Sequence, residues 1–258
     1  MNWLRIISLV SLLLLLVPVV TILYYGLGPL RSQAGYSLNV LRSIELTLFA
    51  SATAAVLDIV MFTPLAYYLA RGRDRLAETL VDVPVSIPHP IVGVALVILG
   101  SPRTPTGMLL NSLGINFYNT ILGLVIALVI VSAPIYVKSV QPYFESRDPS
   151  PEDFAMGLGA SRLRTMVSVV IPNSLPGIQS GSFIAMSRAL SEFGSISIIA
   201  YYVLQYPFYG VSPASVTIYS LFSGAVPGGL DAAVTASAVM ILISLPIALA
   251  GHVFRSGR

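Results

Sequence analysis

The chain of 258 residues contains no cysteine, two histidines and a single tryptophan, and only 10% of its residues are charged. Without cysteine the chain can form no disulfide bridge, no thiolate metal site and no cysteine nucleophile. The two histidines, His89 and His252, lie too far apart in the sequence for a helical metal-binding motif. We therefore expect no metal site and no cofactor.

The shortage of charge accompanies a hydrophobic content of 55%. Soluble domains carry about a quarter charged residues, so this composition indicates an integral membrane protein. The net charge of +3 comes from basic residues at the ends of apolar segments, without interleaved aromatic side chains, which argues against a nucleic-acid partner. The sequence has no nucleophile, no acid–base arrangement and no phosphate-binding loop of Walker type, so we expect a non-enzymatic protein that does not hydrolyse ATP by itself.

Six apolar segments are long enough to cross a bilayer of about 30 Å. The first passes through Pro18 to Tyr24 without a small-x-small cleavage site, so we expect an uncleaved anchor rather than a signal peptide. The sequence predicts one all-α, polytopic transmembrane domain over residues 1–258. Its predicted spans are about 6–25, 44–70, 81–99, 120–140, 175–203 and 232–253.

The distribution of Lys and Arg predicts the orientation of these spans. With the amino terminus inside, ten of the fourteen basic residues fall on cytoplasmic segments, whereas Arg31, Arg42 and Arg103 fall outside. The ten are Arg5, Arg71, Arg73, Arg75, Lys138, Arg147, Arg162, Arg164, Arg255 and Arg258. This bias follows the positive-inside rule and predicts a multi-pass protein of the cell membrane with both termini in the cytoplasm.

The segment from Ser150 to Gln179 is the one long polar-to-apolar stretch between spans. Ser150 followed by Pro151 and Asp153 is typical of a capping box that begins a helix. Ser161 predicts a second cap, and we expect two short helices bent about Gly159, the second of them reaching Pro172.

One face of the first short helix is apolar. Phe154 and Leu158 lie one turn apart and share this face with Ala155, beside the charged residues Asp153, Arg162 and Arg164. A small apolar surface on a cytoplasmic loop suits a groove on a partner protein. The alternative is a solvated connector between two spans.

The spacing Asp153-Phe154-Ala155, then Gly159, then Val169-x-Ile171-Pro172 resembles the EAA loop of ABC importer permeases. Asp153 stands where the family has Glu, and Glu152 can hold the acidic role with a shift of one residue. The resemblance implies that the loop over about 143–174 docks on ATPase subunits. The residues that it implies for this coupling are Glu152, Asp153, Phe154, Ala155, Leu158, Gly159, Ala160, Ser161 and Pro172.

A second motif narrows the resemblance. The run from Arg188 to Gly194, Arg-Ala-Leu-Ser-Glu-Phe-Gly, is similar to the Arg-Ala-Leu-Gly-Glu-Phe-Gly signature of oxyanion permeases. This similarity implies a permease homodimer, two cytoplasmic ABC ATPase subunits and an external oxyanion-binding protein, with molybdate or tungstate as cargo. A sulfate or thiosulfate permease is the alternative within the family. A secondary transporter or an intramembrane enzyme is the alternative outside it, although we find none of the inverted repeats that secondary transport predicts.

Asp58, Arg188 and Glu192 lie well inside the predicted spans 44–70 and 175–203. Charged side chains in hydrocarbon cost about 2.5 to 3.5 kcal/mol each, so we expect these three to face protein or water and to face one another. Arg188 either contacts a passing oxyanion or forms a buried ion pair with Glu192 that fixes the helix register.

Three prolines, Pro84, Pro88 and Pro90, open the third span. They predict a kinked helix that lines a pathway or, alternatively, only shape the start of the helix. His89 between them is either a pH sensor or a satisfied interfacial residue. On the outer side, we expect residues 101–116 and 205–230 to form the docking face for a binding protein, with a short surface helix in the second segment.

Overall fold

The structure, a computed structural model, describes residues 2–72, 74–224 and 228–256. Arg73 and Arg258, which count toward the predicted orientation, and part of the segment 205–230 lie outside this range. Within it the regular structure is helical apart from one isolated β-bridge between Val203 and Val211, so the all-α prediction is confirmed. The longer helices are α1 (Asn2–Leu27), α2 (Leu38–Gly72), α6 (Ile121–Glu145), α9 (Ile171–Leu190) and α12 (Gly229–Ser256). The shorter ones are α3 (Arg75–Ser86), α4 (His89–Leu99), α5 (Pro105–Ser112), α7 (Ser150–Gly157), α8 (Arg162–Thr165), α10 (Ile196–Ile199) and α11 (Ala214–Ser223).

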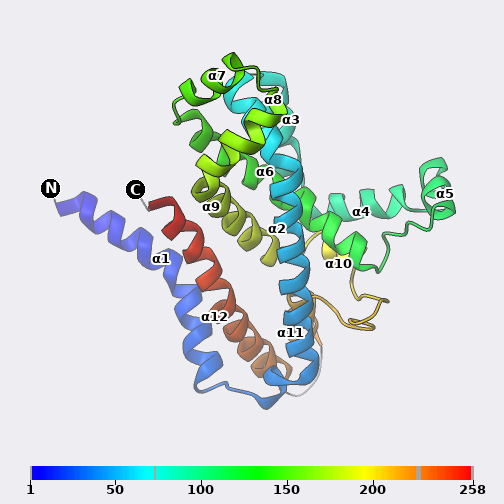
Figure 1. Cartoon of the computed structure of the whole chain (residues 1–258). Coiled ribbons are helices and arrows are strands. Elements are labelled where there is room, and N and C mark those ends of the chain that lie inside the picture. Colours follow the sequence, from blue (N-terminus) through cyan, green and yellow to red (C-terminus); the bar gives the residue numbers. More distant parts are fainter. Residues whose placement is uncertain (1, 73, 225–227, 257–258) are drawn as a thin grey trace.

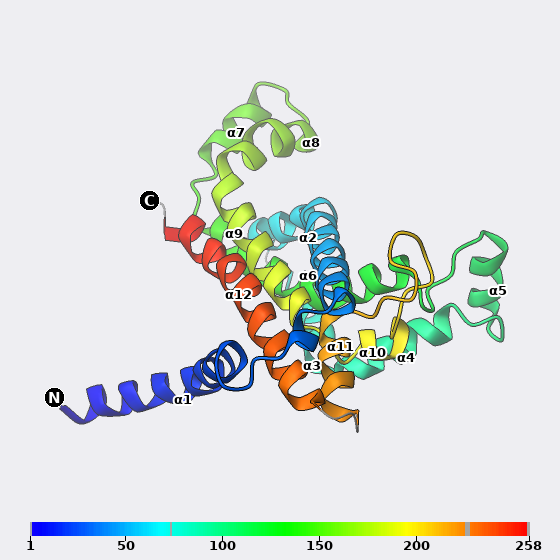
Figure 2. The ribbon, with the colours of Figure 1, turned by 90° about the horizontal axis from the view of Figure 1, so that it is seen from below.

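Helix α6 lies at the centre of the molecule, against α2 on one side and α9 on the other, and α12 covers the far side of α9 (Figure 1). Gly177 and Gly181 on α9 allow the close approach to α6, because a Cβ at these positions would meet Tyr143 and Val140 at 2.3 and 2.4 Å. Helix α1 contacts α12 and extends away from the rest of the chain (Figure 2). The core that positions the sites described below is therefore the group α2, α6, α9 and α12.

Four of the described helices, α1, α2, α6 and α12, are long and apolar enough to cross a membrane. The predicted span over 81–99 is instead two helices, α3 and α4, which meet at 98°. The break occurs because Ile87, which precedes Pro88, is extended, with φ of −99° and ψ of 145°. A residue before proline disfavours the helical region. The pair counts as a fifth crossing only if the bent helices form one span.

The predicted span over 175–203 also differs from the structure. Helix α9 begins at Ile171 and ends at Leu190, and the chain then turns before the short helix α10. The turn is stabilised by Glu192, whose carboxylate accepts a hydrogen bond from the Ser195 amide at 2.8 Å. The short helix expected within 205–230 is present as α11.

Candidate functional site

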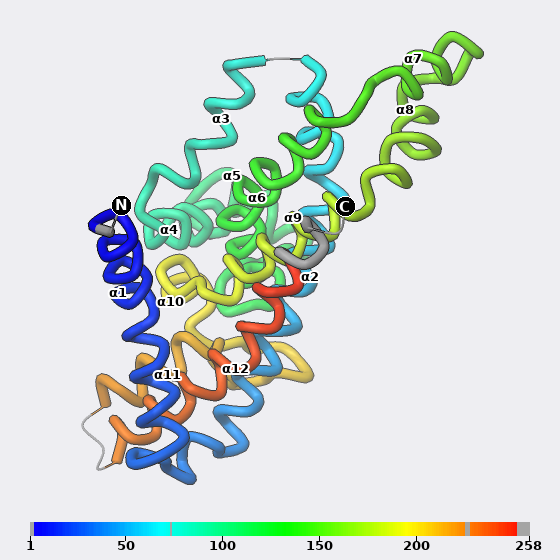
Figure 3. Tube along the Cα trace, turned by 90° about the vertical axis from the view of Figure 1, so that its left-hand side faces the viewer, coloured from blue at the N-terminus to red at the C-terminus, as the bar shows by residue number. Residues whose placement is uncertain are grey.

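Helices α7 and α8 project from one end of the helix group and form the part of the chain farthest from α11 (Figures 1 and 3). Helix α7 starts at Ser150, and its preceding residue is Pro149, which forms no side-chain cap. The oxygen Oδ1 of Asp148 accepts hydrogen bonds from the amide and the hydroxyl of Ser150, at 3.0 and 2.7 Å. These bonds lower the pKa of the Asp148 carboxyl. The predicted capping box from Ser150 to Asp153 is therefore wrong, because Asp148 takes the capping role two residues earlier.

The bend between the two short helices follows the prediction. Gly159 has a φ of +89°, a conformation that glycine adopts without steric cost. The Ala160 amide donates to the Ala155 carbonyl and the Gly159 amide to the Met156 carbonyl, which is the Schellman arrangement that closes a helix. The Ser161 hydroxyl then accepts from the Arg164 amide at 3.3 Å and caps α8.

Beyond α8 the helical path continues farther than expected. The chain passes through a π-helical turn, η2 (Met166–Val170), directly into α9, so the run that we expected to reach Pro172 continues to Leu190. Pro172 has no amide hydrogen for a bond to the preceding turn, and such an interruption favours the wider π turn. Helix α8 is therefore continuous, through η2, with a central helix of the molecule.

The apolar face of α7 points to solvent. Phe154 is 71% exposed and Leu158 is 76% exposed, while Asp153, Arg162 and Arg164 around them are exposed as well. Contiguous exposed apolar side chains rimmed by charged residues are a feature of protein–protein contact surfaces. The structure thus brings together the side chains that the sequence assigned to a docking face.

The opposite face of α7 is fastened to the ends of two long helices. Glu152 is buried, and its Oε1 lies 2.7 Å from Nη2 of Arg71 at the end of α2. Its Oε2 accepts from the Tyr67 hydroxyl at 2.5 Å and from Nε of Arg71 at 3.3 Å. Arg71 also donates through Nη1 to the carbonyl of Phe144, near the end of α6, at 3.0 Å. Of the two acids that the sequence left open, Glu152 is held inside the chain and Asp153 is free at the surface.

Sequence reasoning missed the part played by Arg71 and Tyr67. They precede Glu152 by 81 and 85 residues, so no local spacing connects them. The position of Glu152 on α7 could have indicated that a basic partner exists. Glu152 lies on the side opposite the apolar docking face, and a carboxylate that turns inward requires a cation.

The second site is a charge cluster at the turn between α9 and α10. Nη2 of Arg188 lies 3.0 Å from Oε2 of Glu192, which is 1% exposed. Oε1 of Glu192 accepts from both the amide and the hydroxyl of Ser195, at 2.8 and 2.9 Å. Both carboxylate oxygens are therefore hydrogen-bonded, as a buried charge requires.

His89, at the start of α4, completes this cluster. Its Nδ1 lies 3.1 Å from Oε2 of Glu192, and its Nε2 lies 3.0 Å from Nη2 of Arg188. Nη2 of Arg188 also lies 2.8 Å from Nδ1 of His89, so the imidazole contacts both members of the ion pair. The histidine thus joins the first turn of α4 to the end of α9, as expected of an interfacial residue with polar partners.

Asp58 is not part of this cluster, contrary to the expectation that the three intramembrane charges face one another. It is buried between α2 and α6, where its Oδ2 accepts from the Ser132 hydroxyl at 2.6 Å. Farther along the same two helices, the hydroxyls of Thr63 and Tyr136 lie 2.6 Å apart. The side of α2 that carries Asp58 faces α6, so its carboxyl belongs to a polar seam between these helices.

The three prolines take different places. Pro88 precedes the first residue of α4, and Pro90 lies in the first turn of this helix. Pro90 packs against Gly194, since a Cβ added to Gly194 would lie only 3.0 Å from Cδ of Pro90. Pro84 lies within α3 and lines an apolar cavity. Gly93 lets α4 pack against Ser195, because a Cβ added to Gly93 would lie only 2.5 Å from the carbonyl oxygen of Ser195. The break between α3 and α4 is therefore held directly against the charge cluster.

A metal site is not part of this arrangement as far as the chain is described: residues 2–72, 74–224 and 228–256 hold no group of three or more His, Asp or Glu side chains that could bind one. Both sites contain a buried glutamate paired with an arginine. The α7–α8 segment has, in addition, an exposed apolar face.

These features define a helical protein with several apolar helices of membrane-spanning length and a projecting segment that carries an exposed apolar face. Residues 62–256 match the model of the family described as "Binding-protein-dependent transport system inner membrane component", and the chain belongs to this family. The matched range includes both the α7–α8 segment and the charge cluster.

Several characterised relatives are similar over much of the chain. The molybdate/tungstate transport system permease protein WtpB of Pyrococcus furiosus is 34% identical over 211 residues, which cover 81% of this chain and 75% of that protein. Its counterpart in Pyrococcus abyssi is 35% identical over 170 residues, 63% of this chain and 62% of that protein. The match therefore spans less than two thirds of the P. abyssi protein. The sulfate transport system permease protein CysT of Salmonella typhimurium is 32% identical over 165 residues, 63% of this chain and 60% of that protein.

The fold is also found in a solved structure. The crystal structure of a bacterial ABC transporter involved in the import of the acidic polysaccharide alginate contains a chain that superposes with a TM-score of 0.66. The match covers 98% of this chain and 96% of the other at 20% sequence identity, so the likeness concerns the fold alone.

Proposed function

We propose that the chain is the membrane-spanning, non-catalytic permease subunit of an ABC importer. Two copies form a homodimer around a central pathway, two cytoplasmic ATPase subunits bind the α7–α8 segments, and an external binding protein delivers the cargo. In this arrangement both termini and the α7–α8 end lie in the cytoplasm. Membership of the binding-protein-dependent family supports the proposal.

One observation carries the proposal: the α7–α8 segment has an exposed apolar face and a buried ionic base. Phe154 and Leu158 are open to a partner, while Glu152 ties the same helix to Arg71. A partner that moves the apolar face therefore moves the ends of α2 and α6 as well. This is the mechanical property that a subunit driven by a separate ATPase requires.

We propose an oxyanion as the cargo, with molybdate or tungstate ahead of sulfate or thiosulfate. Relatives named for molybdate and tungstate match 63% to 81% of the chain at 32% to 35% identity, whereas relatives named for sulfate match 59% to 63% of it at 29% to 34%. Uptake of each anion into vesicles that hold the whole transporter would separate these cargoes, together with calorimetric titration of the cognate binding protein. Sulfate uptake without molybdate or tungstate uptake would select the sulfate alternative.

Within the membrane we propose that the cluster of Arg188, Glu192 and His89 fixes the helix arrangement rather than holding the anion. The contacts of Glu192 support this role, because both carboxylate oxygens are occupied and the Arg188–Glu192 pair as a whole carries no net charge that would attract an anion. The broken pair α3–α4, which the cluster holds in place, is our candidate for the border of the pathway.

The docking face is tested with alanine variants. Phe154→Ala and Leu158→Ala should each weaken binding of the ATPase, by about 2 kcal/mol or roughly 30-fold for whichever is the anchor, because buried aromatic and aliphatic anchors dominate interfaces. The protein itself should still insert and keep its thermal stability, since both side chains are exposed. Pull-down of the ATPase from detergent solution measures the effect.

Leu113→Ala is the matched control, because Leu113 follows α5 and is 65% exposed, close to the exposure of Phe154 and Leu158. It should leave ATPase binding unchanged. Undiminished binding in the double variant Phe154→Ala/Leu158→Ala would contradict the docking assignment, and uptake that continues without ATP would contradict the proposed function as a whole.

A further inference from the structure

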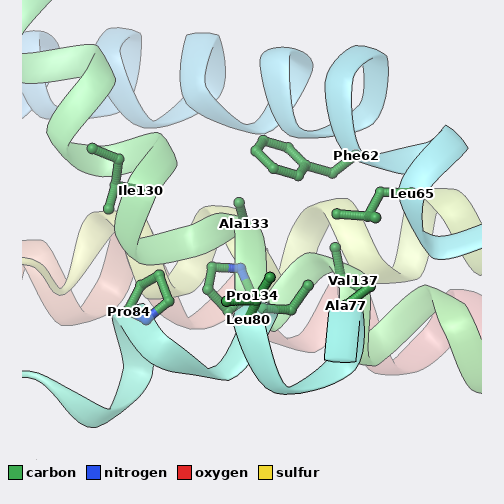
Figure 4. A pocket seen from close by; sticks show the side chains of 10 residues that line it. Phe62, Leu65, Ala77, Leu80, Pro84, Ile130, Ala133, Pro134 and Val137 are labelled. Carbon is green, nitrogen blue, oxygen red and sulfur yellow. The ribbon is translucent and has the colours of Figure 1, made fainter. Parts of the chain in front are cut away.

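An apolar groove lies between α2, α6 and α3 (Figure 4). Its volume is about 380 Å³, within the range of small-molecule sites. All ten lining side chains are aliphatic, aromatic or proline, and none of them carries a hydrogen-bond donor or acceptor. Among those that determine its shape are Phe62 and Leu65 of α2, Leu80 and Pro84 of α3, and Ala133 and Val137 of α6.

The chemistry of this lining selects the occupant. A buried water needs two to four polar partners, which these walls do not provide. Two of the walls, α2 and α6, are helices that meet the length and hydropathy of membrane spans, so the groove lies where hydrocarbon is the surrounding solvent. From Ile130 to Val137 it follows eight residues of α6, a rise of about 10 Å at 1.5 Å per residue. An unbranched hydrocarbon chain suits an apolar groove of this lining.

Polar side chains of α6 bind α3 beside the groove. Nζ of Lys138 lies 2.5 Å from Oδ1 of Asp82, and Nε2 of Gln141 donates to Oε1 of Glu78 at 3.1 Å. The far end of α3 is fixed by the 98° break into α4. These restraints at both ends preform the site, which lowers the entropic cost of binding.

Basic side chains lie near one end of the groove. Lys138 adjoins the lining residue Val137 and is 55% exposed at its side chain, and Arg75, two residues before the lining residue Ala77, is exposed. The lysine ammonium has three donors, so its pairing with Asp82 leaves donors for a second oxyanion group. This end of α3 lies on the same side of the molecule as the α7–α8 segment (Figure 3).

We propose that this groove binds one acyl chain of a membrane phospholipid whose phosphate lies against Lys138 and Arg75. The assignment to the cytoplasmic leaflet rests on the orientation in the proposed function, whereas the lipid site itself does not. A bound chain completes the packing between α3 and the α2–α6 pair, next to the broken helix α3–α4. The lipid is then a structural ligand of the element that we place at the pathway.

The first test fills the groove and measures retained lipid. Ala77→Phe on α3 places a ring in the groove, and Thr79→Phe, which adds a ring to an exposed position of the same helix, is the matched control. After extensive washing in detergent, native mass spectrometry and lipid extraction should find about one phospholipid per chain in the parent and in Thr79→Phe, and none in Ala77→Phe. Equal retention in all three proteins would overturn the proposal. So would bound fatty acid or detergent without phospholipid.

The second test does not depend on the folding of a groove-filling variant. Trp3 is the only tryptophan of the chain, so Phe62→Trp, at a half-buried lining position, in a Trp3→Phe background reports on the groove. Phospholipids brominated in their acyl chains should quench this reporter saturably at low mole fraction. The exposed position Leu76, with Leu76→Trp, should show quenching that rises in proportion to lipid content. Quenching that rises in proportion to lipid content at both positions would overturn the proposal, because it would show only ordinary contact with the membrane.

A second copy of the chain is the competing occupant. Because the chain has no cysteine, a single Leu80→Cys substitution can be crosslinked without background. A crosslinked dimer through this position would overturn the lipid assignment. None of these measurements uses transport, so their failure leaves the proposed function intact, and a failure of ATP-driven uptake leaves the lipid site intact.

Discussion

Two buried glutamates, Glu192 and Glu152, each bind one arginine, but they do so in opposite settings. Arg188 lies four residues before Glu192 at the end of α9, while Arg71 lies 81 residues before Glu152 at the end of α2. The first pair is surrounded by protein on every side of the carboxylate. The second lies beneath a helix whose other face is open to solvent. An Arg–Glu pair thus joins α4, α9 and the α10 turn inside the helix group in one case, and holds α7 on the ends of α2 and α6 in the other.

The surroundings decide what each pair can transmit. Around Glu192 the first turn of α4, the end of α9 and the start of α10 meet through His89, Arg188 and Ser195, and no polar group of the carboxylate is left for a ligand. Around Glu152 the ionic base is complete, yet Phe154 stays 71% exposed on the far side of the helix. We infer that the first region is built for stability and the second for contact with a partner.

The largest effect expected from this difference is on stability. Arg188→Ala removes the cation from a carboxylate that is 1% exposed, and breaking a buried pair in this way costs about 3 to 5 kcal/mol. We expect low yield and a lower unfolding temperature in detergent. Arg188→Ala/Glu192→Ala should recover part of the loss, because no orphaned charge remains. Normal stability of the single variant, with altered uptake kinetics, would favour the other interpretation of Arg188 as a contact for the passing anion.

A smaller loss is expected at the second pair. Arg71→Ala removes a bidentate partner of Glu152, and hydrogen bonds to charged groups contribute about 1.5 to 3 kcal/mol. The side chain of Glu152 is 9% exposed, against 1% for Glu192, so we place the loss near 2 kcal/mol, below that of Arg188→Ala. ATP-driven uptake should fall further than stability does, because α7 is no longer fastened to α2. Thermal unfolding and uptake are measured on the same preparation.

The reversed pair sharpens the result. Arg71→Glu/Glu152→Arg keeps opposite charges in contact, so it should regain uptake that each single reversal lacks. If the reversed pair and both single reversals transport equally, the ionic base plays no part in coupling.

The same comparison shows what the sequence could predict. The Arg188–Glu192 pair, the bend at Gly159 and the open face of Phe154 and Leu158 follow from local spacing, and the structure agrees with all of them. The all-α fold follows from composition and apolar length. Local spacing predicts these features because both partners lie within one turn or one helix face.

The features that the sequence did not predict depend on distant segments. Asp58 pairs with Ser132 rather than with the charge cluster, since the rotation of α2 about its axis is set by packing against α6. His89 meets Glu192 only because the chain breaks at Ile87 and turns by 98°. Proline positions indicate that a break occurs, but its angle is determined by the contacts of α4 with the α9–α10 turn. Arg71 was missed for the same reason.

The bend of the docking segment is expected to have a moderate effect. Gly159→Val places a β-branched residue at a φ of +89°, and L-residues in this region cost about 1 to 2 kcal/mol. The space around the position is open, so the penalty is one of backbone conformation. We expect an assembled complex whose ATP hydrolysis is no longer coupled to uptake. Gly157→Val is the control, because Gly157 is equally open but has no positive φ. Equal uptake in the two variants would remove the bend from the mechanism.

The smallest effect concerns the start of α7, which Asp148 caps. Hydrogen bonds from the amide and the hydroxyl of Ser150 hold the pKa of Asp148 below its usual range, so the folded protein binds this proton more weakly than the unfolded chain. The contribution of the cap is therefore complete above the unfolded pKa of about 3.9 and is lost as the pH falls through the lower folded value. Asp148→Asn keeps an acceptor oxygen but removes the charge. We expect a lower unfolding temperature than the parent at pH of about 7, and a difference that shrinks once the pH falls below about 4. Because Asp148 is fully exposed, this change should be smaller than that of Gly159→Val, and it should leave the Arg188 cluster untouched. A difference between the two proteins that stays constant across this range would show that the charge of Asp148 does not stabilise the docking helix.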